Sequence, residues 1–259
     1  MKERINTDGV LLHDQRAHLF REDYSGKLES YCDSAFKYGR MRIRETVDQM
    51  LSDLSPKSKI LDMGCGTGYF LNYLSKKGHD VYGIDLSQEM IRHLKEIYGE
   101  MHVRHGDLRQ LPYEDESFDA VISIETLRYF DDVQSVLREG YRVLKKGGIA
   151  LFTAAPFHSL NFYGYFNRLC RKVNFRKGIS CYQSFETVSS FEKYLKEVRF
   201  SKVSIHGYFF GPYFLLDKVM PSISRQFMKW GEPMDKWLSQ KESLRNFSNH
   251  LVAVVKRGD

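Results

Sequence analysis

The chain has 259 residues, of which 42% are hydrophobic, 28% are charged and 6 are proline, with a net charge of +6. This composition is typical of a globular protein with a sizeable core, and it excludes a disordered, fibrous or miniature scaffold. The N-terminus is charged where a signal peptide is apolar, and no run approaches the roughly 18 apolar residues of a membrane span. We therefore expect a cytoplasmic protein.

Apolar runs of strand length alternate with segments of helical periodicity from about residue 40 to residue 155. The pattern predicts strands over residues 59–63, 81–85, 102–107, 120–124 and 149–154. Strands that alternate with helices indicate a parallel sheet, so the predicted fold class is α/β.

One helix is well marked by its ends. Apolar residues recur at helical spacing from Val133 to Leu144, and Asp132 is placed to cap the start. Two lysines followed by two glycines, Lys145 to Gly148, are typical of a helix C-terminus and predict that the helix stops there. Beyond residue 155, the pattern predicts a helix near 187–198 and strands over 202–208 and 250–256.

Charge divides the chain unequally. Residues 1–150 hold 22 basic against 25 acidic side chains, whereas residues 151–259 hold 17 against 8. Residues 156–183 alone contain five basic and seven aromatic residues and no acidic one. The C-terminal part is therefore the expected place for an anionic or aromatic ligand.

The four cysteines point to no special chemistry. They include no C-x-x-C pair, so we expect reduced thiols and neither a metal site nor a redox site. These residues are Cys32, Cys65, Cys170 and Cys181.

The strongest local motif is a buried strand that runs into three alternating glycines, Gly64, Gly66 and Gly68, and then into a helix. Glycines let the backbone approach a ligand, and a helix N-terminus favours negative charge. A tight strand-to-helix turn alone would also explain them. The context favours a ligand, because Asp85 ends the next strand, where a carboxylate can accept both hydroxyls of a ribose.

Two acidic residues also have simpler interpretations. Asp85 would serve equally as a helix cap before Leu86 and Ser87. Asp107 follows the third strand, where it would accept from an adenine amine while the Leu108 amide donates to the ring, or would simply shape a turn.

Taken together, these motifs resemble the class I S-adenosylmethionine-dependent methyltransferases, in particular the large small-molecule group. Residues 38–155 match closely and residues 187–256 loosely. The resemblance rests on five ordered segments: residues 61–68, 81–90, 106–113, 117–123 and 137–148. It implies a Rossmann-like, seven-stranded, mostly parallel sheet whose last strand is antiparallel, with helices on both faces.

The resemblance also implies a cofactor, S-adenosyl-L-methionine, with S-adenosyl-L-homocysteine as product. Backbone at Gly64 and Gly66 would hold the methionine part, Asp62 its ammonium group and Asp85 the ribose. Leu86 and Met90 would flank the adenine, and Ser123 or Ile124 would lie beside the sulfonium. Tyr38 and Arg42 are placed like residues that reach the methionine carboxylate, with Arg40 as a competing choice.

The acceptor side is less marked. The sulfonium is an activated methyl donor, so a general base is optional. Members of this group commonly have histidine at the position of Arg128, which here is suited to grip a carboxylate or phosphate or to pair with Asp131 or Asp132. Other candidate bases or acceptor contacts are Tyr129, His158, Tyr24 and Tyr31.

We expect methyl transfer to an oxygen or nitrogen of a small, anionic or aromatic metabolite. A lipid-linked or saccharide acceptor met at a membrane surface ranks second, and RNA ranks last, so no nucleic-acid partner is expected. A non-catalytic cofactor-binding scaffold is the alternative of another class. We expect residues 1–259 to form one domain, with substrate-side insertions over 156–186 and 211–249.

Overall fold

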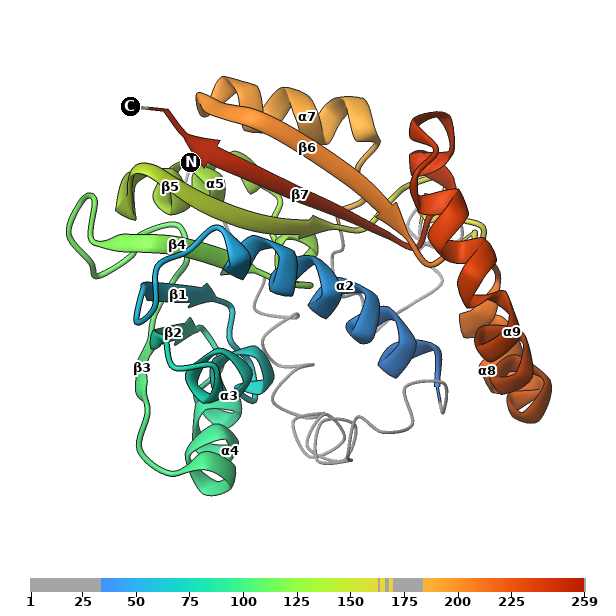
Figure 1. Ribbon diagram of the computed structural model, residues 1–259, viewed down its shortest axis with the longest axis horizontal. Coiled ribbons are helices and arrows are strands. Elements are labelled where there is room, and N and C mark those ends of the chain that lie inside the picture. Colours follow the sequence, from blue (N-terminus) through green and yellow to red (C-terminus); the bar gives the residue numbers. More distant parts are fainter. Residues whose placement is uncertain (1–33, 163, 166–167, 170–183, 259) are drawn as a thin grey trace.

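The computed structural model describes residues 34–162, 164–165, 168–169 and 184–258. Its centre is a seven-stranded sheet in the order β3-β2-β1-β4-β5-β7-β6 (Figure 1). The pairs from β3 to β5 are parallel, and β7 runs antiparallel to both β5 and β6. The predicted α/β class and the antiparallel last strand are therefore confirmed.

The predicted strands are all present, and all except β1 differ from the prediction at one or both ends. The strands are β1 (Lys59–Met63), β2 (Asp80–Asp85), β3 (His102–His105), β4 (Phe118–Ser123), β5 (Leu144–Ala154), β6 (Phe200–Tyr208) and β7 (His250–Arg257). The helices are α2 (Ala35–Ser52), α3 (Tyr69–Lys76), α4 (Gln88–Tyr98), α5 (Val133–Val143), α7 (Val188–Glu197), α8 (Tyr213–Val219) and α9 (Pro221–Ser239), with 3-10 turns η2 (Leu127–Tyr129) and η3 (Glu242–Phe247).

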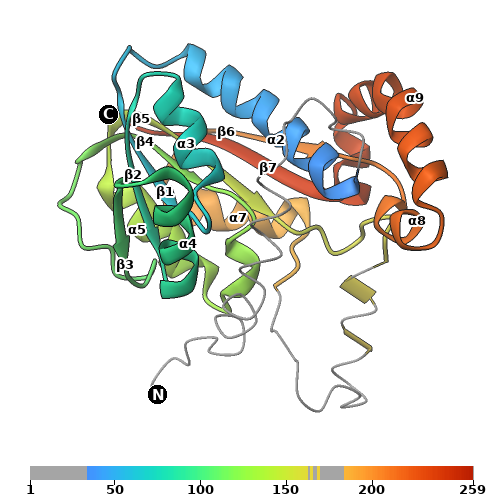
Figure 2. The same ribbon diagram turned by 90° about the horizontal axis from the view of Figure 1, so that it is seen from below.

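Alternation along the strands divides the core into two layers. Ile60, Ile122 and Leu151 face a cluster with residues of α2, α3 and α4, whereas Leu61 and Phe152 face a cluster with residues of α5 and α7. Because successive strand side chains point to opposite faces, each buried strand needs apolar residues at every position. Helices therefore cover both faces of the sheet (Figure 2).

The ends of α5 bear out the predicted cap and correct the predicted stop. Asp132 accepts a hydrogen bond from the Ser135 amide at 3.1 Å, as expected of an N-cap. The helix ends at Val143, however, and the expected stop at Lys145 to Gly148 lies inside β5. The strand begins early because Leu144 already pairs with Phe118 of β4.

The segments on the acceptor side are described in part. Residues 211–249, expected as an insertion, form α8, α9 and η3 between β6 and β7. The apolar residues Phe162, Phe166, Leu169 and Val173 recur at helical spacing and predict an amphipathic helix over residues 160–173, but half of these residues lie outside the described part of the chain. Among the described helices, none is long and apolar enough to cross a bilayer.

Candidate cofactor and acceptor site

The glycine turn joins the carboxyl ends of β1 and β2. The amides of Gly64 and Cys65 both donate to the Ile84 carbonyl, at 2.8 and 3.1 Å. Gly64 has a φ of 84°, and a Cβ there would lie 2.4 Å from the Thr126 side chain. Gly66 has a φ of 52°, and a Cβ there would meet no described atom within 4 Å. The turn thus needs glycine for its own backbone, and at Gly66 it leaves the backbone approachable.

Asp85 links this turn to the end of β2. One carboxylate oxygen accepts from the Gly66 amide at 2.8 Å, and the other accepts from the Ser87 amide at 2.9 Å. The N-cap of α4 is Ser87, whose hydroxyl accepts from the Met90 amide, so the helix-cap interpretation of Asp85 is wrong. A carboxylate has about four acceptor sites, so two amides fix Asp85 and leave it able to accept from a ligand.

Asp62 is a second carboxylate at the same turn. Its exposed fraction is 3%. Burial, followed by the charge of Asp85, raises the pKa of Asp62 to about 7, while Arg40 acts in the opposite direction. A buried carboxylate beside a second, half-buried one favours a cationic ligand. The ammonium and sulfonium groups of S-adenosylmethionine fit this requirement.

The residues expected around the adenine follow the carboxyl ends of β2 and β3. Met90 and Leu108 are buried, and Leu86 is half-buried with its carbonyl accepting from His105 Nε2 at 2.9 Å. Asp107 pairs with Arg109 at 2.8 Å and also accepts from the Arg109 amide at 2.9 Å. These contacts are those of a turn residue, and they hold Asp107 ionised with its pKa below the usual range despite the opposing effect of burial.

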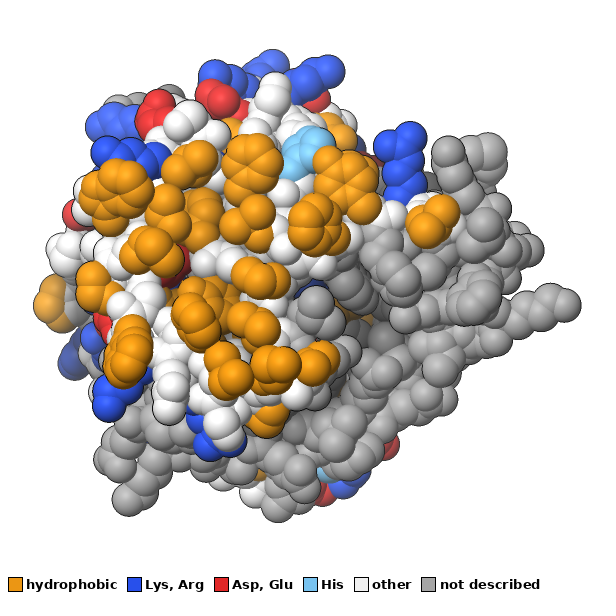
Figure 3. All heavy atoms as spheres, turned by 90° about the vertical axis from the view of Figure 1, so that its right-hand side faces the viewer, with side chains coloured by type: hydrophobic (Ala, Val, Ile, Leu, Met, Phe, Trp, Pro, Cys, Tyr) orange, Lys and Arg blue, Asp and Glu red, His pale blue; other side chains and the backbone are white. Residues whose placement is uncertain are grey.

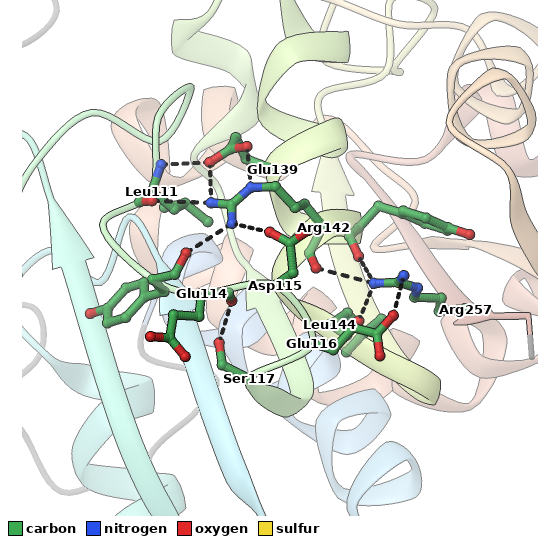
Figure 4. Close-up of polar contacts among 11 residues, drawn as sticks. Leu111, Glu114, Asp115, Glu116, Ser117, Glu139, Arg142, Leu144 and Arg257 are labelled. Carbon is green, nitrogen blue, oxygen red and sulfur yellow. Dashed lines mark hydrogen bonds and ion pairs between the residues drawn. The ribbon is translucent and has the colours of Figure 1, made fainter.

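The loop after Asp107 is clamped by α5 (Figure 4). Arg142 donates to the carbonyls of Leu111 and Tyr113 at 3.1 and 2.8 Å, and it pairs with Glu139 at 2.7 Å. Glu139 in turn accepts from the Leu111 amide at 2.6 Å. One ion pair thus satisfies several loop groups, which fixes the loop that begins at Asp107 and Leu108.

The structure corrects the assignment on α2. Arg42 pairs with Asp235 of α9 at 2.9 Å, and the Tyr38 hydroxyl donates to the same carboxylate at 3.2 Å. Both side chains are buried there, so they are engaged with α9 rather than with the glycine turn. Arg40 instead acts electrostatically on Asp62 and Glu125. The competing choice, Arg40, is therefore the better candidate for the methionine carboxylate.

The end of β4 meets the glycine turn directly. Ser123 is buried and donates to the Met63 carbonyl at 3.0 Å, and Ile124 is buried beside it. The Thr126 hydroxyl lies 3.3 Å from the Gly64 carbonyl. Residues after β4 are therefore in contact with the turn that the cofactor is expected to occupy.

A charged cluster follows at Glu125, which has a φ of 60°. Its carboxylate lies 2.9 Å from His250 Nδ1 at the start of β7 and forms an ion pair with Arg128. Burial opposes its ionisation, but Arg128, His250 and Arg40 outweigh burial and hold the pKa of Glu125 well below the usual range. A strained backbone at a charged residue is common at functional sites.

The remaining acceptor candidates are dispersed. Tyr129 lies in η2, and His158 contacts the Tyr165 hydroxyl at 2.5 Å through Nδ1. Tyr24 and Tyr31 lie outside the described residues.

Sequence reasoning missed Glu125 and His250 as site residues. Glu125 stood in the strand-to-loop segment already considered, and a charged residue directly after β4 was an available signal. For His250 the sequence offered no such signal. It lies 125 residues from Glu125 in the chain, and only the pairing of β7 with β5 and β6 brings the two side chains together.

Comparisons with known proteins agree with this geometry. Residues 61–152 match the family model described as a methyltransferase domain. A malonyl-[acyl-carrier protein] O-methyltransferase of Hamiltonella defensa is 34% identical over 140 residues, which are 54% of this chain and 53% of the relative. A demethylmenaquinone methyltransferase of Bacillus mycoides is 33% identical over 153 residues, which are 55% and 64% of the two chains. The chain spans about half the length of the curated relatives it matches.

Solved structures share the fold at lower identity. A SAM-dependent methyltransferase from Archaeoglobus fulgidus superposes with a TM-score of 0.58 at 18% identity, covering 93% of this chain and 99% of that one. A Haemonchus contortus phosphoethanolamine N-methyltransferase 2 in complex with S-adenosyl-L-methionine gives a TM-score of 0.56 at 18% identity, covering 82% of this chain and 53% of that one.

The sheet order, the glycine turn and the matched domain define the class. Residues 61–152 match a methyltransferase domain, and the described chain has the fold of the class I S-adenosylmethionine-dependent methyltransferases. The cofactor of this class is S-adenosyl-L-methionine.

Proposed function

We propose that the protein transfers a methyl group from S-adenosyl-L-methionine to an acceptor bound beyond the carboxyl ends of β1 and β4. The observation that carries the proposal is the pair of carboxylates, Asp62 and Asp85, held at the Gly66 turn. Burying Asp62 beside the second, half-buried carboxylate of Asp85 costs free energy that a cationic ligand offsets. A domain that bound no such cofactor would have no physical need for this arrangement.

Each residue at the turn has a role that follows from its contacts. Asp85 is oriented by two amides and accepts the ribose hydroxyls, and Asp62 faces the ammonium group. Arg40 is the cation available for the methionine carboxylate, since it already acts on Asp62 and Glu125. The Gly66 backbone lies along the methionine part because no side chain blocks it.

When bound, the cofactor supplies an activated methyl group on a sulfonium. The protein then has to align an acceptor oxygen or nitrogen and remove its proton where it carries one. We assign the acceptor side to the cluster of Glu125, Arg128 and His250, which lies beside the cofactor turn through Thr126. The Glu125 carboxylate contacts both Arg128 and His250 and therefore fixes the orientation of both side chains.

Titration calorimetry of the purified protein with S-adenosylmethionine tests the proposal first. We expect a single binding event, and labelled cofactor incubated with a cell extract is expected to transfer its methyl group to a compound that mass spectrometry identifies. Absence of binding would leave the scaffold interpretation, and binding without transfer to any component of the extract would contradict methyl transfer.

The raised pKa of Asp62 predicts a pH-dependent cofactor affinity. Because the ammonium group favours the ionised carboxylate, affinity should rise about tenfold between about pH 5.5 and pH 7, with release of a proton on binding. The same raised pKa makes the folded, cofactor-free protein bind this proton more tightly than the unfolded chain. Its contribution to stability is therefore lost as pH rises from about 4 to about 7.

Calorimetry in buffers of different ionisation enthalpy measures the released proton. The Asp62→Asn variant, which keeps the shape but cannot titrate, should bind more weakly and lose the pH dependence over this range. A pH dependence that persists in Asp62→Asn would assign the proton to another group.

Arg128→Gln tests the acceptor side. Because Arg128 pairs with Glu125, which we place on the acceptor side, we expect a higher acceptor KM or a lower kcat, with cofactor affinity nearly unchanged. The matched control is Arg138→Gln, since Arg138 is exposed on α5 and lies 3.8 Å from Asp132. Equal turnover by the two variants would reduce Arg128 to a surface role.

A further inference from the structure

One face of the described molecule is apolar and open to solvent (Figure 3). The twelve exposed large hydrophobic side chains among the described residues all lie within 160–169 or 219–247. Six of them define what we call the α9 apolar face: Met220, Ile223, Phe227, Trp230, Met234 and Trp237. Monomeric proteins rarely expose a contiguous patch of this kind without a use for it.

The spacing along α9 explains the face. Its members recur at intervals of three and four residues, which places them on one stripe of a helix. A second stripe of the helix is buried against the domain and contains Met228 together with two serines and an aspartate, Ser224, Ser239 and Asp235. The helix therefore packs on the protein through a largely polar side and presents its apolar side outward, the reverse of an ordinary surface helix.

The two most exposed members are aromatic, and a third aromatic residue is more than half exposed. Trp230 is 79% exposed, Phe227 59% and Trp237 55%. Tryptophan is suited to the boundary between water and acyl chains, because its ring is apolar and its indole N–H donates to polar groups. Leaving this much apolar side-chain surface in contact with water costs free energy, which a partner that covered the face would offset.

Charge decides what covers this face. Arg225 and Lys229 project from α9, and Lys241 lies over the Trp237 ring at 4.8 Å. Within the described parts of the chain, none of these three cations lies within ion-pair distance of a carboxylate. A second copy of the chain would bring the same cations together, whereas an anionic surface would pair with them.

We propose that the α9 apolar face docks the protein on a phospholipid bilayer that contains anionic lipids. An amphipathic helix with Trp and Phe on one side and Lys and Arg on its polar side lies in the plane of the membrane interface. The cations snorkel to the headgroups while the aromatic side chains enter the acyl boundary.

Docking in this way sets the orientation of the site. α8 begins five residues after β6 ends, and Asp235 of α9 accepts from the Phe210 amide at 2.9 Å, so the face lies at the edge where the parallel strands end. Figure 1 shows α8 and α9 on that side of the sheet. An acceptor resident in the bilayer would then reach the cofactor from the docked side, a consequence that rests on the proposed function.

The two tryptophans of the chain both lie on this face, so tryptophan fluorescence, excited at a wavelength where the tyrosines do not absorb, reports on it alone. With vesicles of phosphatidylcholine mixed with phosphatidylglycerol, we expect a blue shift, protection from acrylamide and cosedimentation of the protein. Emission that is already blue-shifted and protected without vesicles would show that the chain covers its own face. A dimer that forms without vesicles and is abolished by Trp230→Gln would assign the face to a second copy. Either result overturns the proposal.

Variants separate the apolar contribution from the electrostatic one. Phe227→Gln with Trp230→Gln should weaken vesicle binding at least about tenfold, whereas Trp230→Phe with Trp237→Phe keeps the apolar character and should retain it. Arg225→Gln with Lys229→Gln should weaken binding to anionic vesicles and leave binding to neutral vesicles unchanged. The matched control pair on α7, Lys193→Gln with Lys196→Gln, should leave binding to both kinds of vesicle unchanged. If none of these substitutions changes the affinity for vesicles, the proposal is refuted.

Cofactor calorimetry on the same variants keeps the two proposals apart. Vesicle binding that fails while cofactor binding persists would refute docking alone. Cofactor binding that fails while vesicle binding persists would refute the proposed function alone.

Discussion

Asp235→Ala is expected to lower the free energy of unfolding by about 3 kcal/mol, because it removes the buried carboxylate that pairs with Arg42 and leaves this guanidinium with its more exposed partner, Glu45. Arg42 and Asp235 are 4% and 3% exposed and lie 2.9 Å apart. Asp235 also accepts from the Tyr38 hydroxyl and from the Phe210 amide. One side chain therefore satisfies groups from α2 and from the end of β6, and its loss leaves each of them without this acceptor.

Urea unfolding monitored by circular dichroism measures this loss. Glu232→Ala is the matched control, since Glu232 lies on the same helix in a surface pair with Lys236 and should cost at most about 1 kcal/mol. The double variant Arg42→Met with Asp235→Leu should recover much of the stability, because it removes both buried charges. If Asp235→Ala is no more destabilising than Glu232→Ala, then this pair does not anchor α9.

The same cluster connects the two functional regions. Tyr38 and Arg42 lie on α2 on either side of Arg40, and Asp235 lies on α9 between Met234 and Trp237. Fixing α9 on α2 therefore also fixes the helix that brings Arg40 toward Asp62 and Glu125. Any displacement of α9 on a membrane would be transmitted to the cofactor side through these hydrogen bonds.

Local patterns were sufficient to predict the central sheet. The strand at residues 59–63 is observed with the predicted ends, because a run of apolar residues between a polar loop and a glycine turn has few alternatives. The Asp132 cap was predicted for a similar reason, since capping depends on residues within one helical turn. The ends of β4 and β5 differed because pairing with neighbouring strands set them.

Long-range contacts were not predictable in this way. Tyr38 and Arg42 matched a motif position, but the partner that engages them is 193 residues from Arg42 in the chain. The hydrophobic and basic composition of residues 211–249 was visible in the sequence, yet composition did not indicate which stripe of α9 would be buried. The structure shows that a buried carboxylate decided the orientation, and this left the aromatic stripe outside.

Asp85→Ala is expected to weaken S-adenosylmethionine binding by at least about tenfold, which corresponds to about 1.5–3 kcal/mol for hydrogen bonds to a charged group. The amides of Gly66 and Ser87 hold this carboxylate at 2.8 and 2.9 Å, so it is oriented before the ligand arrives and loses little freedom on binding. Removing it also relaxes the turn and lowers the negative charge that favours a cation beside Asp62.

Calorimetry of Asp85→Ala against Asp80→Ala separates the binding role from a general effect on β2. Asp80 lies at the opposite end of the same strand and is exposed, so its loss should leave cofactor affinity unchanged. Asp85→Asn should be intermediate, since an amide oxygen still accepts from a ribose hydroxyl but carries no charge. A thermal melt of each variant shows whether the fold is kept. An unaltered dissociation constant in a folded Asp85→Ala protein would show that the carboxylate bound to the Gly66 amide does not contact the cofactor.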